Sequence, residues 1–401
     1  MMNRSQSIQS FMIAITATAL FTPLDRIEQP LLLVEDGIIA DVTSRARREV
    51  PKHCRAVDFG DGILAPGFID IHIHGGGGHD VMEAGADALP PVERLLAAHG
   101  VSSYFPTTVT APMDATLSAL ARLADAIEAA DRNQQGFDRS GNLRARPLGI
   151  HLEGPFISHS RRGVHPPENL LTPSVAAFHR FWQAARGHIR VLTIAPELPG
   201  AVEVIAEASA RGVCVSLGHS DADLNAARAG FAAGARHATH TFNAMRPLDH
   251  RDPGILGEVL TNNRIGADII ADGIHVSPEI VKLFLQAKGV EGAVLITDAI
   301  AATGMPDGRY RLGPIEVDVK DGKCTVDGRL AGSTLTMDRA VRNVTKFSNW
   351  SLRDAVQAAT LNAARAVGLA QQHGVLGVGM EASFVVLNSA GEVLRTVVRG
   401  V

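Results

Sequence analysis

The sequence predicts an α/β protein in which a (β/α)8 barrel of the TIM type is accompanied by a small discontinuous β-sandwich domain. Three observations support this fold. From Pro66 onward, short apolar runs alternate with helical stretches. Most of these runs lack strict polar alternation, as expected for strands that are buried on both faces. Strand-like segments return at the end of the chain, and neither terminal segment alone could bury a core, so we expect them to pair.

The barrel is expected to contain eight strands and the helices between them. The strands are predicted at 67–74, 101–108, 145–152, 190–196, 213–219, 237–242, 266–271 and 292–297. Helices are predicted at 114–130, 174–186, 221–233 and 278–288, followed by two more at 335–346 and 352–366. Ser277 followed by Pro278 is typical of a helix start, because serine caps the first turn and proline fits its first position. This alternation is typical of a closed parallel barrel.

The small domain is predicted from short strands at both ends of the chain. They are expected at 13–20, 31–34, 38–42, 56–59 and 63–64, and again at 383–388 and 393–399. Asp36-Gly37 between apolar runs predicts a hairpin. The segment 314–329 is expected to form inserted short strands. We therefore predict residues 1–65 and 371–401 as the two parts of the small domain and 66–370 as the barrel.

The composition is that of an ordinary globular protein. Of its 401 residues, 46% are hydrophobic and 20% are charged. A net charge of −4 offers no attraction for nucleic acid or an acidic membrane, so an anionic substrate would need local hydrogen-bond donors. Three scattered cysteines without a C-x-x-C pattern indicate a reducing compartment, and we expect a cytoplasmic protein.

The N-terminal segment permits two interpretations. Arg4, the apolar stretch 11–21 and its Ala17-Thr18-Ala19 pattern resemble a signal peptide. Threonines interrupt the stretch, which is equally typical of a first β-strand. No apolar run reaches 18 residues, so no membrane span is predicted.

The first predicted barrel strand ends in His72 and His74, followed by four glycines. Residues i and i+2 of a strand point to the same face, so the two imidazoles share one space. The glycine run lets the chain turn and leaves room above the strand end. The pair could be half of a metal site or two hydrogen-bonded core histidines.

Further polar residues occur where other predicted strands end. In such barrels the carboxyl ends of the strands carry the functional residues. The residues at these positions are Glu153, His219, His240 and Asp298. Individually, His219 could cap a helix and Asp298 could be an N-cap. Together they suit Zn²⁺ or Fe²⁺ with an open position for water, which predicts a metal-dependent hydrolase.

The residue types also suggest a mechanism. A divalent ion lowers the pKa of a bound water towards ~7. Asp298 is placed to take the water's proton and return it to a leaving amine. His275 lies beyond strand seven, where it could polarise the scissile carbonyl or hold the substrate; alternatively, it is a loop or helix-start residue.

Nearly the whole chain resembles the N-acetylglucosamine-6-phosphate deacetylases of the amidohydrolase superfamily. The segments that carry the resemblance are Pro66-Gly67-Phe68-Ile69-Asp70, His151-Leu152-Glu153-Gly154-Pro155-Phe156, Gly218-His219-Ser220, His240-Thr241-Phe242-Asn243-Ala244-Met245, Ala271-Asp272-Gly273-Ile274-His275, Thr297-Asp298-Ala299 and Leu330-Ala331-Gly332-Ser333. The resemblance implies metal-dependent hydrolysis of the acetamide of N-acetylglucosamine 6-phosphate, giving glucosamine 6-phosphate and acetate.

The resemblance also implies roles for the strand-end residues. Glu153, His219 and His240 would bind the principal metal. Asp298 would be the catalytic acid/base, and His275 the histidine that contacts the substrate. His72 and His74 would admit a second metal bridged through Glu153, so the site would hold one or two divalent ions.

The substrate contacts are implied in the same way. Asn243 and Ala244 match positions that hold the sugar phosphate, partly through backbone N–H groups. Arg251 matches an arginine that reaches a phosphate across a subunit interface, which implies a homodimer; alternatively, it is a solvated loop charge. Further substrate-lining positions are Val164, Leu330, Ala331 and Gly332.

Three other functions are compatible with this fold. N-acetylgalactosamine 6-phosphate differs from the first substrate in the orientation of one hydroxyl group, which the motifs do not report. A cyclic amidase usually bridges two metals with a carboxylated lysine, but strand four ends in Ala195-Pro196-Glu197. A non-catalytic sugar-phosphate sensor would not need all the metal ligands and Asp298.

Overall fold

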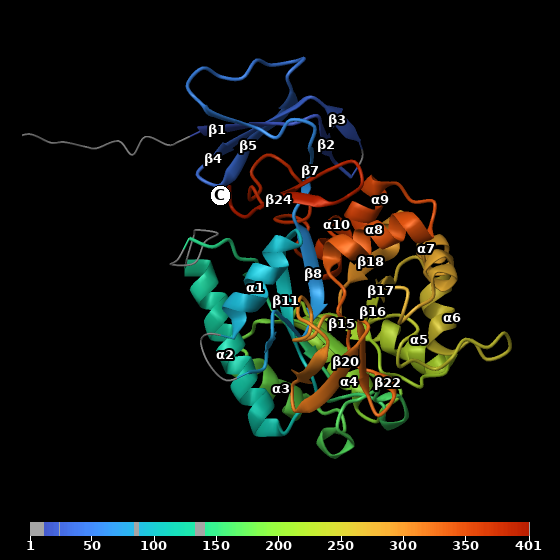
Figure 1. The fold of residues 1–401 in the computed structure, drawn as a ribbon. Coiled ribbons are helices and arrows are strands. Elements are labelled where there is room, and N and C mark those ends of the chain that lie inside the picture. Colours follow the sequence, from blue (N-terminus) through green and yellow to red (C-terminus); the bar gives the residue numbers. More distant parts are fainter. Residues whose placement is uncertain (1–11, 24, 84–87, 133–140, 401) are drawn as a thin grey trace, which may run out of the picture.

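The computed structural model describes residues 12–23, 25–83, 88–132 and 141–400 (Figure 1). Its centre is a parallel sheet in which neighbouring strands follow one another in the chain, and the predicted barrel is confirmed. The eight barrel strands are β8 (Phe68–Ile73), β11 (Val101–Thr108), β13 (Ile150–Glu153), β14 (Ile189–Ile194), β15 (Cys214–Leu217), β16 (His237–Ala238), β17 (Gly266–Ile270) and β18 (Ala293–Ile296). A parallel bridge between Ile73 and Ala299 links the end of β8 to the segment that follows β18.

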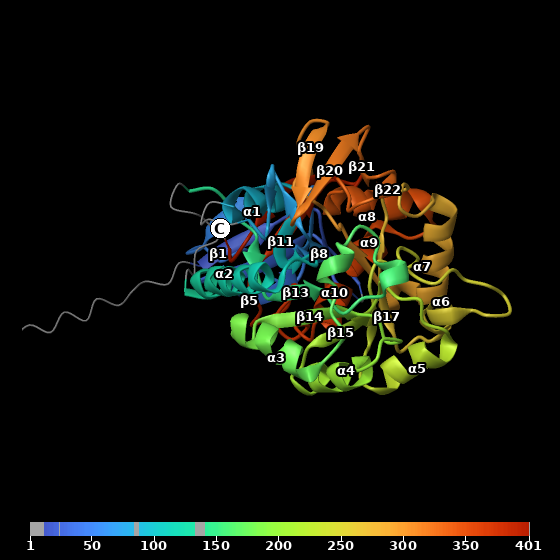
Figure 2. The same ribbon diagram turned by 90° about the horizontal axis from the view of Figure 1, so that it is seen from below.

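Helices surround this sheet, as Figure 2 shows from below. They are α1 (Leu89–Ala98), α2 (Met113–Arg132), α3 (Val175–Ala184), α4 (Ala201–Ala210), α5 (Leu224–Ala232), α6 (Gly254–Thr261), α7 (Pro278–Gly292), α8 (Met337–Phe347), α9 (Leu352–Ala358) and α10 (Leu361–Ala366). Two 3-10 turns, His159–Arg161 and Pro167–Asn169, lie between β13 and α3. Apolar side chains from the strands and the helices form one continuous core.

Some sequence-based boundaries are wrong, and two of them have local backbone reasons. The helix predicted at 352–366 is two helices, because Thr360 has φ −133° and ψ −90°, which are not helical. The strand predicted at 237–242 ends at Ala238, since His240 and Phe242 adopt positive φ values of 30° and 80°. This early end places His240 beyond the strand, where its side chain can face the barrel mouth.

A second body, built from two sheets, lies at the amino ends of the barrel strands (Figure 1). One sheet has the order β5 (Ile38–Ser44), β4 (Pro30–Glu35), β1 (Met12–Thr16) and β6 (Arg55–Asp58). The other has the order β24 (Val393–Val397), β23 (Phe384–Leu387), β7 (Ile63–Pro66), β2 (Ala19–Phe21) and β3 (Arg26–Glu28). A separate apolar cluster that includes Leu20, Leu32 and Phe384 draws on both sheets.

The pairing of β7 with β23 joins the two ends of the chain, as expected for a discontinuous domain. The single strand expected at 13–20 is wrong: β1 and β2 belong to different sheets, because the chain turns between them and Thr18 N–H donates to the carbonyl of Gly62. The domain boundaries at 65/66 and 370/371 stay a prediction.

The N-terminal stretch is described only in part. Residues 12–16 and 19–21 form β1 and β2, whereas Arg4 and Phe11, which belong to the signal-peptide pattern, lie outside the described residues. None of the helices within the described residues has both the length and the apolarity that crossing a bilayer requires.

The inserted strands form a small antiparallel sheet at the opposite end of the barrel from the sandwich (Figure 1). They are β19 (Gly308–Leu312), β20 (Ile315–Lys320), β21 (Lys323–Val326) and β22 (Arg329–Leu330). Short pairs β9 (Gly75–Gly76) and β10 (His79–Asp80) follow β8, and β12 (Arg146–Pro147) pairs with β11. Asp80 Oδ2 accepts a 2.7 Å hydrogen bond from Gly313 N–H, which holds the β19–β20 turn against the barrel.

A buried ion-pair cluster connects the C-terminal segment to the barrel. Glu381 Oε2 lies 2.6 Å from an Arg146 guanidinium nitrogen and 2.8 Å from Arg399 Nε. Ser383 Oγ donates to Glu381 Oε1 over 2.7 Å. Burial favours the neutral acid, but the charge of Arg146 and the hydrogen bond and charge of Arg399 lower the pKa of Glu381. The carboxylate therefore stabilises the folded state.

We expect Glu381→Gln to lower the free energy of unfolding by about 2 kcal/mol at pH 7, because it removes the carboxylate that two partly buried guanidinium groups share, while Arg146 keeps its ion pair with Asp131 at 2.9 Å. The folded-state pKa is lowered, so the contribution is present above the ordinary value of 4.5 and is lost as pH falls below it. Urea unfolding at pH 7 and pH 4 checks this. The gap between wild type and variant should narrow at the lower pH, and a gap independent of pH would refute the ion-pair explanation.

Candidate active site

A cavity of about 210 Å³ opens at the carboxyl ends of the barrel strands. Twelve of the predicted site residues line it: His74, Glu153, Val164, His219, His240, Asn243, Ala244, His275, Asp298, Leu330, Ala331 and Gly332. His72 lies directly behind the wall, fully buried, with its Nε2 3.2 Å from His74 Nε2. The structure therefore brings all the predicted metal ligands and both predicted catalytic residues to one place.

Glu153, His219 and His240 form the first group of donor atoms. Glu153 ends β13, and its Oε1 lies 3.2 Å from His219 Nε2 and 3.1 Å from His240 Nε2. The two Nε2 atoms are 3.0 Å apart. All three side chains are buried, so three lone-pair donors converge where little water can solvate them. This donor set fits a divalent metal such as zinc or iron.

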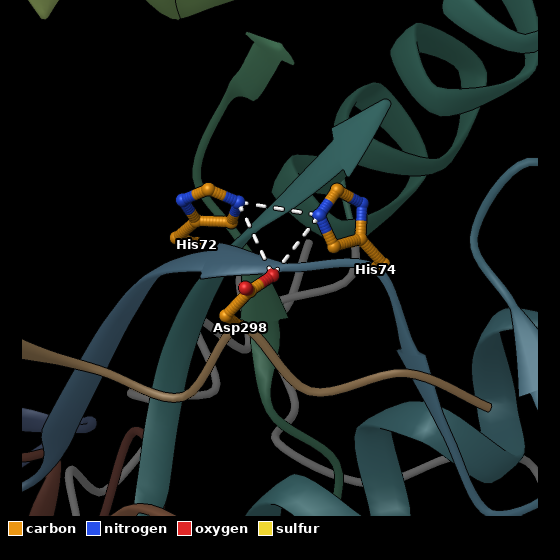
Figure 3. A group of neighbouring side chains, drawn as sticks. All are labelled: His72, His74 and Asp298. Atoms are coloured by element: carbon orange, nitrogen blue, oxygen red, sulfur yellow. Dashed lines mark hydrogen bonds and ion pairs between the residues drawn. The ribbon is translucent and has the colours of Figure 1, made fainter. Parts of the chain in front are cut away.

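His72, His74 and Asp298 form the second group (Figure 3). Asp298 Oδ1 lies 3.5 Å from His72 Nε2 and 3.2 Å from His74 Nε2. His72 lies on β8, His74 directly follows that strand, and Asp298 lies on the loop that follows β18. Glu153 lies between the groups, because its Oε2 is 3.3 Å from His74 Nε2. One carboxylate can therefore serve both groups.

Backbone carbonyls orient two of the imidazoles. His74 Nδ1 lies 3.0 Å from the carbonyl oxygen of Thr107, and His219 Nδ1 lies 3.0 Å from that of Arg161. An Nδ1–H that donates to a carbonyl leaves Nε2 as the lone-pair nitrogen directed into the cavity. His72 and His240 have no such partner at Nδ1 among the described residues.

The electrostatics of the site reflect alternating carboxylates and imidazoles. Burial favours the neutral acid of Asp298, but the charge of His72 and the hydrogen bond and charge of His74 lower its pKa to about 2. Burial likewise opposes protonation of His74, yet hydrogen bonds to Asp298 and Glu153 raise its pKa to about 10, so its Nε2 holds a proton that a bound cation would displace. Burial lowers the pKa of His219 to about 4. Asp298 is therefore ionised near neutral pH and can accept a proton.

Several site residues have unusual backbone conformations. His219, Ala244 and Asp298 have φ values of 47°, 50° and 50°, and His240 has φ 30°. Non-glycine residues rarely adopt positive φ, which costs on the order of 1–2 kcal/mol per residue. The structure tolerates this cost at all four positions. All four residues line the cavity.

His275 is held by its neighbour Asp272. Its Nδ1 lies 2.7 Å from Asp272 Oδ2, while Asp272 Oδ1 accepts from the backbone N–H groups of Ile274 and His275. Both side chains are buried, at 7% and 4% exposure. With Nδ1 engaged, Nε2 is the ring nitrogen left for a substrate.

His165 lines the cavity but was not among the predicted site residues. Its Nε2 lies 3.6 Å from Glu153 Oε2, its Nδ1 lies 2.8 Å from Thr110 Oγ1, and its ring packs edge-on against His219. It lies on a loop after the 3-10 turn rather than at a strand end, so only its position next to Val164 pointed to it. The cavity walls also include Val109, Gly163 and Leu312, which had no polar signal in the sequence.

Arg251 lies outside the cavity. It occupies an exposed loop before α6, where its backbone N–H donates to Asp249 Oδ1 over 2.8 Å. Its role across a subunit interface stays a prediction.

Residues 63–401 match the sequence model of the Amidohydrolase family. The chain is 36% identical to N-acetylglucosamine-6-phosphate deacetylase of Bacillus subtilis over 95% of this chain and 94% of that protein. It is 37% identical to N-acetylgalactosamine-6-phosphate deacetylase of Escherichia coli O157:H7, over 96% and 97%. A mutant of the Mycobacterium smegmatis N-acetyl-D-glucosamine-6-phosphate deacetylase, solved with N-acetyl-D-glucosamine-6-phosphate, is similar in structure. It superposes with a TM-score of 0.89 at 34% identity, covering 97% of this chain and 98% of that one.

Proposed function

The chain belongs to the amidohydrolase family, and on that premise we propose that it hydrolyses the acetamide of N-acetylglucosamine 6-phosphate. The products are acetate and glucosamine 6-phosphate. The observation that carries the proposal is that the two donor groups, one of which includes Asp298, meet at one cavity. Similar proteins named for this activity support the choice of substrate.

We propose a divalent metal, zinc or iron, with Glu153, His219 and His240 as the principal ligands and His72 and His74 admitting a second ion. The fit rests on the donor chemistry, because buried Nε2 and carboxylate oxygen atoms face one another at 3.0–3.2 Å. When bound there, the cation supplies Lewis acidity that makes water nucleophilic near neutral pH.

Asp298 acts as the acid and base. Its carboxylate takes a proton from the water that adds to the acetyl carbonyl carbon, and it returns this proton to the amine nitrogen as the C–N bond breaks. Its main chain is fixed on both sides: its N–H donates to the carbonyl of His72 over 2.9 Å, and its carbonyl accepts from Ser333 N–H over 2.8 Å. The carboxylate therefore meets the substrate without rearranging.

His275 contacts the substrate. Because Asp272 engages Nδ1, the Nε2 side of the ring can donate to the acetyl carbonyl or to a sugar hydroxyl group. Asn243 and Ala244 hold the phosphate, partly through backbone N–H groups, and Val164 and residues 330–332 cover the sugar.

We further propose a cytoplasmic homodimer in which Arg251 reaches the phosphate in the partner's cavity. Its planar guanidinium can donate two hydrogen bonds to a phosphate. The cysteines Cys54, Cys214 and Cys324 are all free thiols, which agrees with a reducing compartment.

Acetate release from four sugars tests the proposal: N-acetylglucosamine and N-acetylgalactosamine, each with and without the 6-phosphate. We expect N-acetylglucosamine 6-phosphate to have the highest kcat/KM. Loss of the phosphate should lower kcat/KM on the order of 10²-fold, because hydrogen bonds to a charged group contribute about 1.5–3 kcal/mol each. Equal rates with and without phosphate would contradict the assigned substrate class.

The galactosamine epimer is the second candidate, since a relative of equal similarity is named for it. A higher kcat/KM for N-acetylgalactosamine 6-phosphate would favour it. A cyclic amidase is disfavoured, because no lysine lines the cavity in the described part of the chain.

A further inference from the structure

Beneath His240, outside the cavity lining, lies a buried pair of titratable residues that the proposed chemistry does not use. Asp268 on β17 and His237 on β16 are 2% and 1% exposed, and Asp268 Oδ2 lies 3.1 Å from His237 Nε2. His237 Nδ1 has no partner among the described residues. The ring proton is therefore on Nε2, and this N–H donates a hydrogen bond to the Asp268 carboxylate.

The other carboxylate oxygen of Asp268 binds the backbone of His240. Oδ1 accepts a short hydrogen bond from His240 N–H, and the Asp268 carbonyl accepts from Thr241 N–H over 2.9 Å. Asp268 thus holds two consecutive amides, at His240 and at the residue that follows it. Hydrogen bonds from N–H groups to a carboxylate are about twice as strong as neutral ones.

His240 depends on such support more than the other cavity histidines do. Its φ of 30° is unfavourable for a residue with a side chain, and its Nδ1 has no partner among the described residues. By contrast, His74 and His219 are oriented by carbonyl oxygens at Nδ1. The direction of the His240 ring therefore follows from its backbone, which Asp268 holds.

Space for this arrangement is provided by a neighbouring glycine. His237 pairs in register with Gly266, and a Cβ at Gly266 would lie 2.6 Å from His237 Nδ1. The ring of His237 thus occupies room that any other residue at 266 would fill. The ladder between β16 and β17 is formed by backbone groups, so it does not by itself require the Asp268 carboxylate.

We propose that Asp268 is a positioning residue that presents His240 to the metal, and that His237 fixes the orientation of the Asp268 carboxylate. The proposal rests on the ligand role proposed above for His240. It predicts that loss of the carboxylate acts on metal binding and on kcat, with little effect on KM, because Asp268 does not touch the cavity.

The test uses the full chain, stripped with a chelator and titrated with Zn²⁺ or Co²⁺ against a chromophoric competitor. Asp268→Ala should weaken metal affinity on the order of 10- to 100-fold, change the visible Co²⁺ spectrum and lower kcat. Asp268→Asn should recover most of the affinity, since its Oδ1 still accepts from His240 N–H. His237→Phe should weaken affinity by a smaller factor.

Asp338→Ala is the matched control, because it removes another carboxylate–histidine pair away from the cavity, that of the buried Asp338 with the partly exposed His99 at 3.1 Å. It should lower the thermal midpoint and leave metal affinity and kcat unchanged. If Asp268→Ala lowers only the thermal midpoint, the positioning role is refuted. If Asp268→Ala does not fold, unchanged affinity and Co²⁺ spectrum in His237→Phe refute it.

Metal affinity and the Co²⁺ spectrum are measured without a sugar, so these two readouts separate this proposal from the proposed function. Unchanged metal affinity in Glu153→Gln would refute the ligand set itself. If Glu153→Gln binds the metal more weakly than the wild-type protein while the Asp268 variants bind it equally well, only the role of Asp268 is refuted.

Discussion

Replacing Asp298 with asparagine is expected to lower kcat for acetate release on the order of 10²- to 10⁴-fold, because the amide cannot accept the proton of the attacking water. Glu153, His219 and His240 are untouched, so the principal metal should remain bound. The measurement is steady-state acetate release together with metal analysis of the same protein.

Asp338→Asn serves as the control, since Asp338 lies on α8 and pairs with His99 and Arg342 instead of lining the cavity. It should keep wild-type kcat at a temperature below its unfolding transition. An Asp298→Asn variant that kept full activity with normal metal content would show that the acid/base role belongs to another group.

Glu153→Gln is expected to lose the principal metal and to lower kcat/KM at least on the order of 10³-fold at limiting metal. Within the described residues, Glu153 is the carboxylate that contacts histidines of both groups, with Oε1 near His219 and His240 and Oε2 near His74. Glutamine preserves the shape but removes the charge and one acceptor oxygen. Metal content after dialysis and acetate release as a function of added Zn²⁺ check this prediction.

The comparison is the double variant His72→Gln, His74→Gln, which alters only the second group. It should still bind one ion at the principal site and keep part of the activity. If the double variant lost all metal while Glu153→Gln kept it, the two donor groups would have to exchange their roles.

The barrel could be predicted because its strands are continuous apolar runs between helical stretches, a pattern set by burial on both faces. The element ends were less predictable. Residues 237–242 are apolar or β-branched enough to suggest a strand, yet the positive φ values of His240 and Phe242 end it at Ala238. At this point His240 N–H donates to the Asp268 carboxylate, a tertiary contact that sequence periodicity does not report.

The convergence of the proposed metal-ligating residues could be predicted for a related reason. Parallel barrel strands bring their carboxyl ends together, so polar residues at those ends must meet regardless of their separation in sequence. His165 and Asp268 lack that signal: the first lies on a long loop, and the second lies within a strand and acts through the backbone of a neighbour. The implied role of Arg251 depends on a second chain, so the structure of one chain does not bring this residue to the cavity.

The most direct test of the account is metal-dependent turnover of N-acetylglucosamine 6-phosphate by the purified protein. Chelator-treated protein should release no acetate, and stepwise addition of Zn²⁺ or Fe²⁺ should restore release, with acetate and primary amine appearing in equal amounts. Undiminished acetate release from protein shown to be free of metal, or no release at any metal loading, would contradict it.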